Sequence, residues 1–283
     1  MKAAQHGLGD SSMLERIDAL FACGAGEHIN IPQIVVVGDQ SSGKSSVLSG
    51  LIRKDLPRDS GLCTRFATKI VFRRAKERGI RASIIPDEDA GVEHRSAIAA
   101  WGELSVDSFD DFTFADIMKE VHNVIGIASP NDVTSGTERK PTFSGDVLQL
   151  EISGPDEEHL SVIDVPGIFR DSTPGLTTKA DIQLVRSMVT RYMENPRSVM
   201  LTVVPANVDV ATQEILHMAN ELDPEGDRTL DFFRTKRPWS DLNHENVGIE
   251  ALRNRLKDVL SGLIRREFTN VRIRLLMMPD SGG

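Results

Sequence analysis

The segment from Gly38 to Ser45 constrains this chain more than any other part of its sequence. It reads GDQSSGKS, fits the phosphate-binding pattern GxxxxGK[ST], and directly follows the apolar run Ile34–Val37. A buried strand before the loop and a helix after it form the structural context that this pattern needs. The sequence therefore predicts a nucleotide-binding loop, and the alternative is a Gly/Ser-rich stretch that matches the pattern by chance.

The residue types in this loop suit the binding of phosphate. Gly38 and Gly43 allow a tight turn with inward-pointing N–H groups, Lys44 can reach the β- and γ-phosphates, and the Ser45 hydroxyl can bind Mg²⁺. A helix over residues 46–52 would direct its positive N-terminal end at the phosphates. The nucleotide-binding candidates are Gly38, Asp39, Gln40, Ser41, Ser42, Gly43, Lys44, Ser45 and Ser46.

Two later segments carry further candidates for the same site. The sequence Asp164-Val165-Pro166-Gly167 follows an apolar strand, so Asp164 is expected to hold Mg²⁺ through water and the Gly167 N–H to meet the γ-phosphate. Thr64 ends a turn-rich segment and is the candidate switch hydroxyl that completes the Mg²⁺ shell. Taken alone, DxPG is more often a turn that ends a strand, and Thr64 could simply open the next strand.

Strands and helices alternate along most of the chain, which indicates an α/β fold. We expect a P-loop NTPase fold with an open, mostly parallel sheet, helices on both faces and amphipathic helices at both termini. Residues 82–85 are expected to pair with 68–74, and residues 90–101 to be irregular. The expected strands are 34–37, 68–74, 82–85, 147–152, 160–163 and 198–204, and the expected helices are 13–21, 46–52, 112–127, 176–193, 210–222 and 247–264.

Composition narrows the class of protein. With 283 residues and 40% hydrophobic content, the chain can bury the core of one large domain or two small ones. It carries 33 Lys and Arg against 42 Asp and Glu, a net charge of −9, so we expect no nucleic acid partner. Neither a secretory leader nor an apolar stretch of about 18 residues is present, which favours a cytosolic or peripheral membrane protein.

Together the motifs resemble the G domain of the dynamin-family GTPases. The similarity runs from about the first helix to Thr229, and it implies GTP and GDP as ligands with Mg²⁺ as cofactor. It also implies that Gln40 positions the attacking water and that Ser41 coordinates a charge-compensating Na⁺ or K⁺ ion. The residues that carry the resemblance are Gly38 to Ser46, Leu56-Pro57-Arg58 with Thr64-Arg65, Asp164 to Ile168, Pro205 to Asp209 and Asp223-Pro224.

The residue after DxPG fits this assignment of Gln40. Many small GTPases have a water-positioning glutamine there, whereas this chain has Ile168, so the catalytic amide must come from elsewhere. One departure lies near the expected cation site, where Asp59 replaces a family glycine, although Gly61 is kept.

The resemblance implies partners as well as ligands. G domains of this family dimerise across their nucleotides, and Asp209 and Arg170 occupy positions that contribute to that interface. The dimer would form between copies of this chain or with full-length relatives. Family analogy alone adds microtubule or membrane association, and a cytoplasmic location with peripheral contact to organelles such as mitochondria.

The family pattern breaks after Thr229. Family members continue into a strand and a T/N-K-x-D motif that reads guanine, but here Thr235-Lys236 is followed by Arg237-Pro238 and lacks the aspartate. We therefore expect an internal deletion that removes one or two edge strands and leaves 198–204 as an exposed, apolar edge. GTP hydrolysis would be impaired. The alternatives are an inactive fragment that acts through full-length relatives, and a phosphohydrolase with relaxed base choice.

This break also sets the expected domain boundaries. Residues 1–30 form a helix before the G domain, residues 31–229 an incomplete G domain, and residues 230–283 a remnant with the last helix and a truncated tail.

Overall fold

The computed structural model describes ten ranges of the chain. These are residues 33–52, 64–106, 111–128, 140–157, 159–174, 176–205, 207–209, 213–225, 229–230 and 249–277. The predicted N-terminal helix over 13–21 and the segment 53–63, which includes Asp59 and Gly61, lie outside the described residues, as do residues 231–248.

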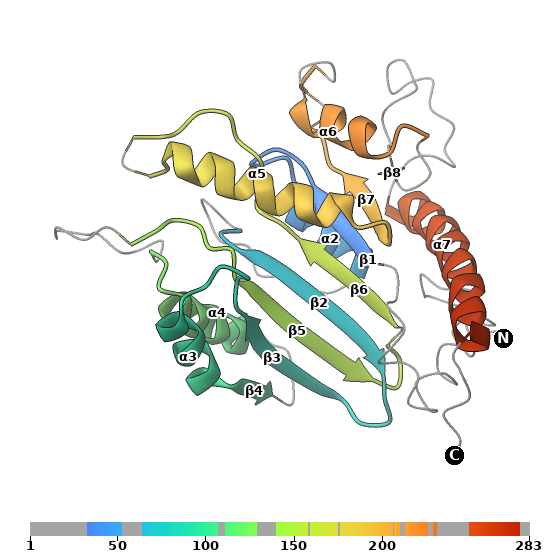
Figure 1. Ribbon diagram of the computed structural model, residues 1–283, viewed down its shortest axis with the longest axis horizontal. Coiled ribbons are helices and arrows are strands. Elements are labelled where there is room, and N and C mark those ends of the chain that lie inside the picture. Colours follow the sequence, from blue (N-terminus) through green and yellow to red (C-terminus); the bar gives the residue numbers. More distant parts are fainter. Residues whose placement is uncertain are drawn as a thin grey trace.

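The described elements form a single eight-stranded sheet with helices packed on it (Figure 1). In chain order they are β1 (Gln33–Val37), α2 (Lys44–Ile52), β2 (Ala67–Arg74), β3 (Gly79–Ile85), α3 (Val92–Trp101), β4 (Glu103–Val106), α4 (Asp111–Ile125), β5 (Val147–Gly154), β6 (Leu160–Asp164), α5 (Lys179–Glu194), β7 (Ser198–Thr202), α6 (Glu214–Leu222), β8 (Thr229–Leu230) and α7 (Ile249–Met277).

The sheet is mostly parallel, as predicted. Its strand order is β4-β3-β5-β2-β6-β1-β7-β8, and β1 pairs in parallel with both β6 and β7. Parallel neighbours on both sides place the carboxyl end of β1 next to the carboxyl ends of β6 and β7. Ligands of open α/β sheets bind at such carboxyl ends, and this is where the phosphate-binding segment begins.

Two hydrophobic clusters enclose the middle of the sheet. Alternate residues of β1 point to opposite faces, so Ile34 and Val36 pack with α2 and α7 while Val35 and Val37 pack with α5 and α6. A third cluster joins α3 and α4 to β3 and β5, on the face that also carries α2 and α7. Helices thus cover both faces around β1, as the sequence predicted.

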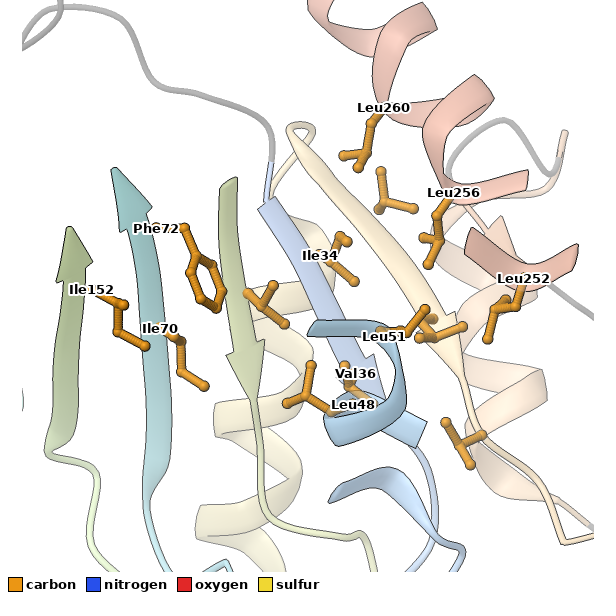
Figure 2. Packing of buried hydrophobic residues seen from close by; sticks show 14 of the residues in the cluster. Ile34, Val36, Leu48, Leu51, Ile70, Phe72, Ile152, Leu252, Leu256 and Leu260 are labelled. Atoms are coloured by element: carbon orange, nitrogen blue, oxygen red, sulfur yellow. The ribbon is translucent and has the colours of Figure 1, made fainter. Parts of the chain in front are cut away.

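The first half of α7 packs beside α2 on one face of the sheet (Figure 2). Leu252, Leu256 and Leu260 fall at helical spacing and are buried, so the apolar stripe predicted over 247–264 is confirmed from Leu252 onward, whereas Ile249 at the start of the helix is exposed. The buried Arg253 donates a hydrogen bond to the carbonyl of Leu51, in the last turn of α2. A guanidinium at this place offsets the negative end of α2.

The predicted pairing of 82–85 with 68–74 is wrong. Strand β5 lies between β3 and β2, antiparallel to the first and parallel to the second. Likewise β5 and β6, joined by a turn at Pro155 and Asp156, do not pair with each other because β2 lies between them. Periodicity predicts strands but does not specify their neighbours, since all these strands carry similar apolar alternation.

The expectation that residues 90–101 are irregular is also wrong. They include α3, of which only Ile98 is buried, so the segment has no apolar stripe that could reveal it. Alanines at 97, 99 and 100 favour the helix locally. The short strand β4 follows and was not predicted.

Strand β7 is not the exposed edge that the sequence predicted. All five of its residues are buried, and Met200 and Leu201 pair with Thr229 and Leu230 of the two-residue strand β8. Side chains of α7 cover one face of β7 and side chains of α5 and α6 cover the other. Whether further strands are missing after Thr229 stays a prediction, because residues 231–248 lie outside the described part.

In the described part of the chain, no helix combines the length and apolar character needed to cross a bilayer.

Candidate nucleotide-binding site

The phosphate loop begins where β1 meets β7. A Cβ atom at Gly38 would lie 2.3 Å from the carbonyl oxygen of Val203, and Val203 in turn donates to the carbonyl of Val37 over 2.8 Å. Only glycine allows the two backbones to approach so closely. Gly43 has φ +95°, in the region that favours glycine, and the chain enters α2 at the next residue. Both glycines are therefore required by the backbone itself.

The DxPG segment is joined to this loop by backbone hydrogen bonds. The Gln40 amide donates to the carbonyl of Ile168 over 3.0 Å, and the Ile168 amide donates to the carbonyl of Gly38 over 3.2 Å. A Cβ atom at Gly167 would lie 2.6 Å from Gln40 Cα and 2.8 Å from Lys44 Nζ. The two motifs, far apart in sequence, therefore form one continuous surface.

Lys44 lies beneath this surface. Its side chain is buried, at 7% exposure, and its ammonium group donates to the carbonyl oxygens of Gly38 at 3.3 Å and Asp39 at 3.0 Å. These bonds hold the ammonium group inside the curve of the loop, where its positive charge can attract a phosphate.

The three residues predicted to bind Mg²⁺ meet at one point. The hydroxyls of Ser45 and Thr64 donate to the same oxygen, Oδ2 of Asp164, over 3.4 and 3.3 Å. The other carboxylate oxygen, Oδ1, is buried and accepts no hydrogen bond from the described residues. Hydroxyl and carboxylate oxygens are the hard ligands that Mg²⁺ prefers, so this donor set fits the ion.

Burial is the main influence on the Asp164 carboxylate and raises its pKa to about 6. The charge of Lys44 and the two hydroxyl hydrogen bonds act in the opposite direction. A buried carboxylate whose charge is only partly compensated is an environment that favours a cation. Within the described ranges, no group of three or more His, Cys, Asp or Glu side chains is placed to hold a metal ion.

The remaining loop residues differ in exposure. Gln40, Ser41 and Ser46 are exposed, and Ser41 adopts φ 61°, unusual for a residue with a side chain. Ser42 is buried and Asp39 is half-buried, and burial raises the pKa of the Asp39 carboxyl against the opposing charges of Arg170 and Lys44. The loop thus presents Gln40 and Ser41 outward and keeps its charged groups inside.

Both residues predicted for a dimer interface are exposed. Arg170 pairs through Nε with Glu214 Oε2 at 3.3 Å, and Arg186 pairs with the other oxygen of Glu214. Asp209 is exposed in the segment after β7, and its carbonyl accepts from Gln213. Glu214 and Arg186 were not predicted from the sequence. Arg170 and Glu214 are 44 positions apart, and no local pattern links them.

The match to known proteins agrees with this geometry. A model of the dynamin family matches residues 34–232, which include the phosphate loop, Thr64 and the DxPG segment. The chain belongs to the dynamin family. The end of the match, two residues past β8, lies close to Thr229, where the sequence was expected to depart from the family pattern.

Among dynamin-family relatives, the chain is similar to interferon-induced GTP-binding proteins. It is 34% identical over 250 residues to the Mx protein of Epinephelus coioides, covering 88% of this chain and 36% of that protein. For Mx2 of Macaca mulatta the identity is 32% over 241 residues, with 85% and 30% covered. For the Mx protein of Perca fluviatilis it is 32% over 249 residues, with 88% and 74% covered.

The chain therefore spans about a third of the length of the first two of these relatives.

Proposed function

We propose that this chain binds GTP together with Mg²⁺ and hydrolyses it to GDP and phosphate. The observation that carries the proposal is the convergence of the Ser45 and Thr64 hydroxyls on Asp164, beside the buried ammonium group of Lys44. Each of these groups is suited to a triphosphate and its cation. The names of the relatives, GTP-binding proteins, favour guanosine as the nucleoside.

In this proposal the loop amides and Lys44 hold the phosphates, and Ser45, Thr64 and Asp164 organise Mg²⁺. Bound there, the ion would neutralise charge on the phosphate oxygens. Positioning and electrostatic stabilisation supply most of the rate acceleration in phosphoryl transfer. The Gly167 N–H would meet the γ-phosphate, because a glycine at this position lets the backbone come close to the loop.

Gln40 is the residue that we propose to orient the attacking water. Its side chain is exposed, and its backbone N–H donates a hydrogen bond to the carbonyl of Ile168. Its backbone also lies close to Gly167. Ser41 next to it would bind the charge-compensating Na⁺ or K⁺ ion. Its exposed, left-handed conformation leaves the hydroxyl accessible.

Arg170 and Asp209 are proposed to contact a second G domain, either of this chain or of a full-length relative. Both side chains are exposed, and Arg170 lies close enough to Asp39 of the loop to influence its charge. Contact with microtubules or with organelle membranes rests on family analogy alone.

One sequence feature favours a second candidate function. No T/N-K-x-D motif follows Thr229, so guanine would lose a carboxylate that accepts two hydrogen bonds. Each such bond contributes about 1.5–3 kcal/mol. The chain would then bind GTP weakly with little preference over ATP, or act as a poorly active fragment that works through full-length relatives.

A competition titration tests the nucleotide binding that both functions depend on and separates guanine-selective from unselective binding. Labelled GTP is titrated into the purified chain with and without Mg²⁺, then displaced by GDP or ATP. Weak, Mg²⁺-dependent binding that both nucleotides displace is expected. Tight GTP binding that excess GDP displaces and excess ATP does not would show that another group reads guanine. No binding of any triphosphate would overturn the proposed function.

A further inference from the structure

Residues 142–146, which we call the connecting segment, lie between the two segments that supply Thr64 and Gly167. The connecting segment leads into β5 and belongs to neither predicted motif. It contacts both of these segments, and the proposed function assigns no role to it.

On one side, the connecting segment contacts the residue after Thr64. The Ser144 amide donates to the carbonyl of Arg65 over 3.0 Å. Arg65 is buried, and its guanidinium donates to the carbonyl of Ala128 after α4. Because Arg65 is fixed at both its backbone and its side chain, the adjacent Thr64 is held within reach of Asp164.

On the other side, the connecting segment contacts the residues that follow DxPG. The rings of Phe143 and Phe169 stack with centroids 5.5 Å apart and planes inclined by 24°. The Thr142 hydroxyl donates to the carbonyl of Leu176 over 2.7 Å. Phe169 is two residues beyond Gly167, so this stack fixes the position of the DxPG backbone.

The connecting segment is itself firmly held. The Asp146 carboxylate is buried, at 1% exposure, and accepts from the Ser144 hydroxyl at 2.7 Å and from the Asp87 amide at 2.9 Å. The Nε2 atom of His94 lies 2.8 Å from the same carboxylate. A buried carboxylate with several hydrogen-bond partners makes a rigid support, since movement of the carboxylate would leave those partners without their hydrogen bonds.

We propose that Phe143 and Phe169 are positioning residues that couple the Thr64 segment to the DxPG segment through the connecting segment. This rests on the proposed function, in which Thr64 and Gly167 respond to the same γ-phosphate. A shared rigid support makes their positions interdependent, so disturbing one segment disturbs the other. The coupling belongs to the folded protein and exists with or without nucleotide.

Hydrogen exchange of the nucleotide-free protein tests the coupling directly. Phe169→Leu removes the stacked ring on the DxPG side, and exchange is then read at the Ser144 amide and at residues 64–66, on the opposite side. An aromatic pair of this kind predicts an increase of about two- to tenfold at those amides. Unchanged exchange there in Phe169→Leu would overturn the proposal.

Two matched variants exclude a general loss of stability. Phe169→Tyr keeps the ring at a half-exposed position and should exchange like wild type. Phe72→Leu removes a more deeply buried ring near the end of β2, away from Asp164, since Thr68 rather than Phe72 pairs with Asp164. It should raise exchange near β2 and leave residues 64–66 and Ser144 unchanged. If Phe72→Leu affects them equally, the coupling is merely global and the proposal fails.

Kinetics separate this proposal from the proposed function. Phe169→Leu should lower kcat several-fold while GDP affinity stays that of wild type, and Phe169→Tyr should restore kcat. If wild-type protein hydrolyses no nucleotide, the proposed function fails, yet the exchange experiment still decides the coupling.

Discussion

The sheet has two halves that are built differently. In the inner half, strands β6, β1, β7 and β8 run parallel, and helices cover both faces, so β7 and nearly all of β1 are buried throughout. In the outer half, β2, β5, β3 and β4 include antiparallel pairs, and burial alternates along β5. Arg73, Arg81 and Glu151 form ion pairs on the exposed face of the outer half.

The difference shows what each half can do. Parallel strands bring their carboxyl ends to one edge, so the inner half can place a loop, a carboxylate and a close backbone contact together. The outer half has one apolar face to bury and one polar face to solvate. We therefore expect substitutions in the inner half to affect both function and stability, and matched substitutions in the outer half to affect little.

The largest expected difference is in nucleotide binding. Lys44→Ala removes a buried ammonium group and about two charge-assisted hydrogen bonds to phosphate, which predicts a loss of affinity of about 10²–10⁴-fold. Lys76→Ala, in the exposed turn between β2 and β3, should leave affinity unchanged. Titration with a labelled triphosphate measures both. Equal affinity of Lys44→Ala and wild type would contradict the site assignment.

Hydrolysis should be the next most sensitive property. Gln40→Ala should lower kcat by about 10²-fold or more with nearly unchanged nucleotide affinity, since orienting the water matters mainly in the transition state. Gln149→Ala makes the same change on the polar face of β5 and should have no effect on turnover. Single-turnover rates decide the matter. Wild-type rates in Gln40→Ala would mean that another residue positions the water.

Backbone contacts should distinguish the halves through stability. Gly38→Ala places a methyl group 2.3 Å from the carbonyl oxygen of Val203, so one of the two backbone segments must move. We expect the free energy of unfolding to fall by about 1–3 kcal/mol. Gly79→Ala in β3 meets only the Ser153 hydroxyl at 3.4 Å, an ordinary contact. Urea unfolding of both variants measures the difference. A Gly79→Ala protein as destabilised as Gly38→Ala would argue against the distinction.

The smallest expected difference is in stability, when a valine in each half is replaced by threonine and a hydroxyl is introduced. Val35→Thr puts a polar group at a position with 0% exposure and should lower the free energy of unfolding by about 1–2 kcal/mol. Val71→Thr, on the half-buried face of β2, should change it by less than about 0.5 kcal/mol. Urea unfolding measures both variants, and similar unfolding free energies would show that these positions in the two halves do not differ.

Local patterns predicted the parts of the site that depend on neighbours in sequence. The strand before Gly38, the helix after Lys44 and the strand ending at Asp164 all form as expected, because loop chemistry and apolar periodicity are encoded over a few residues. The helix α3 was missed because it buries only Ile98. Strand β7 was expected at an exposed edge because the family pattern breaks after Thr229, and the two-residue strand β8 that pairs with it was too short to predict.

The sequence by itself determined the family, the phosphate loop and the identities of the cation-binding candidates Ser45, Thr64 and Asp164. Only the tertiary structure decided that β5 separates β3 from β2, that Glu214 holds Arg170, and that Phe143 stacks on Phe169. These contacts join residues that are 26 or more positions apart in the printed sequence. Periodicity specifies which face of an element is apolar, whereas partners across such separations are selected by packing of the whole sheet.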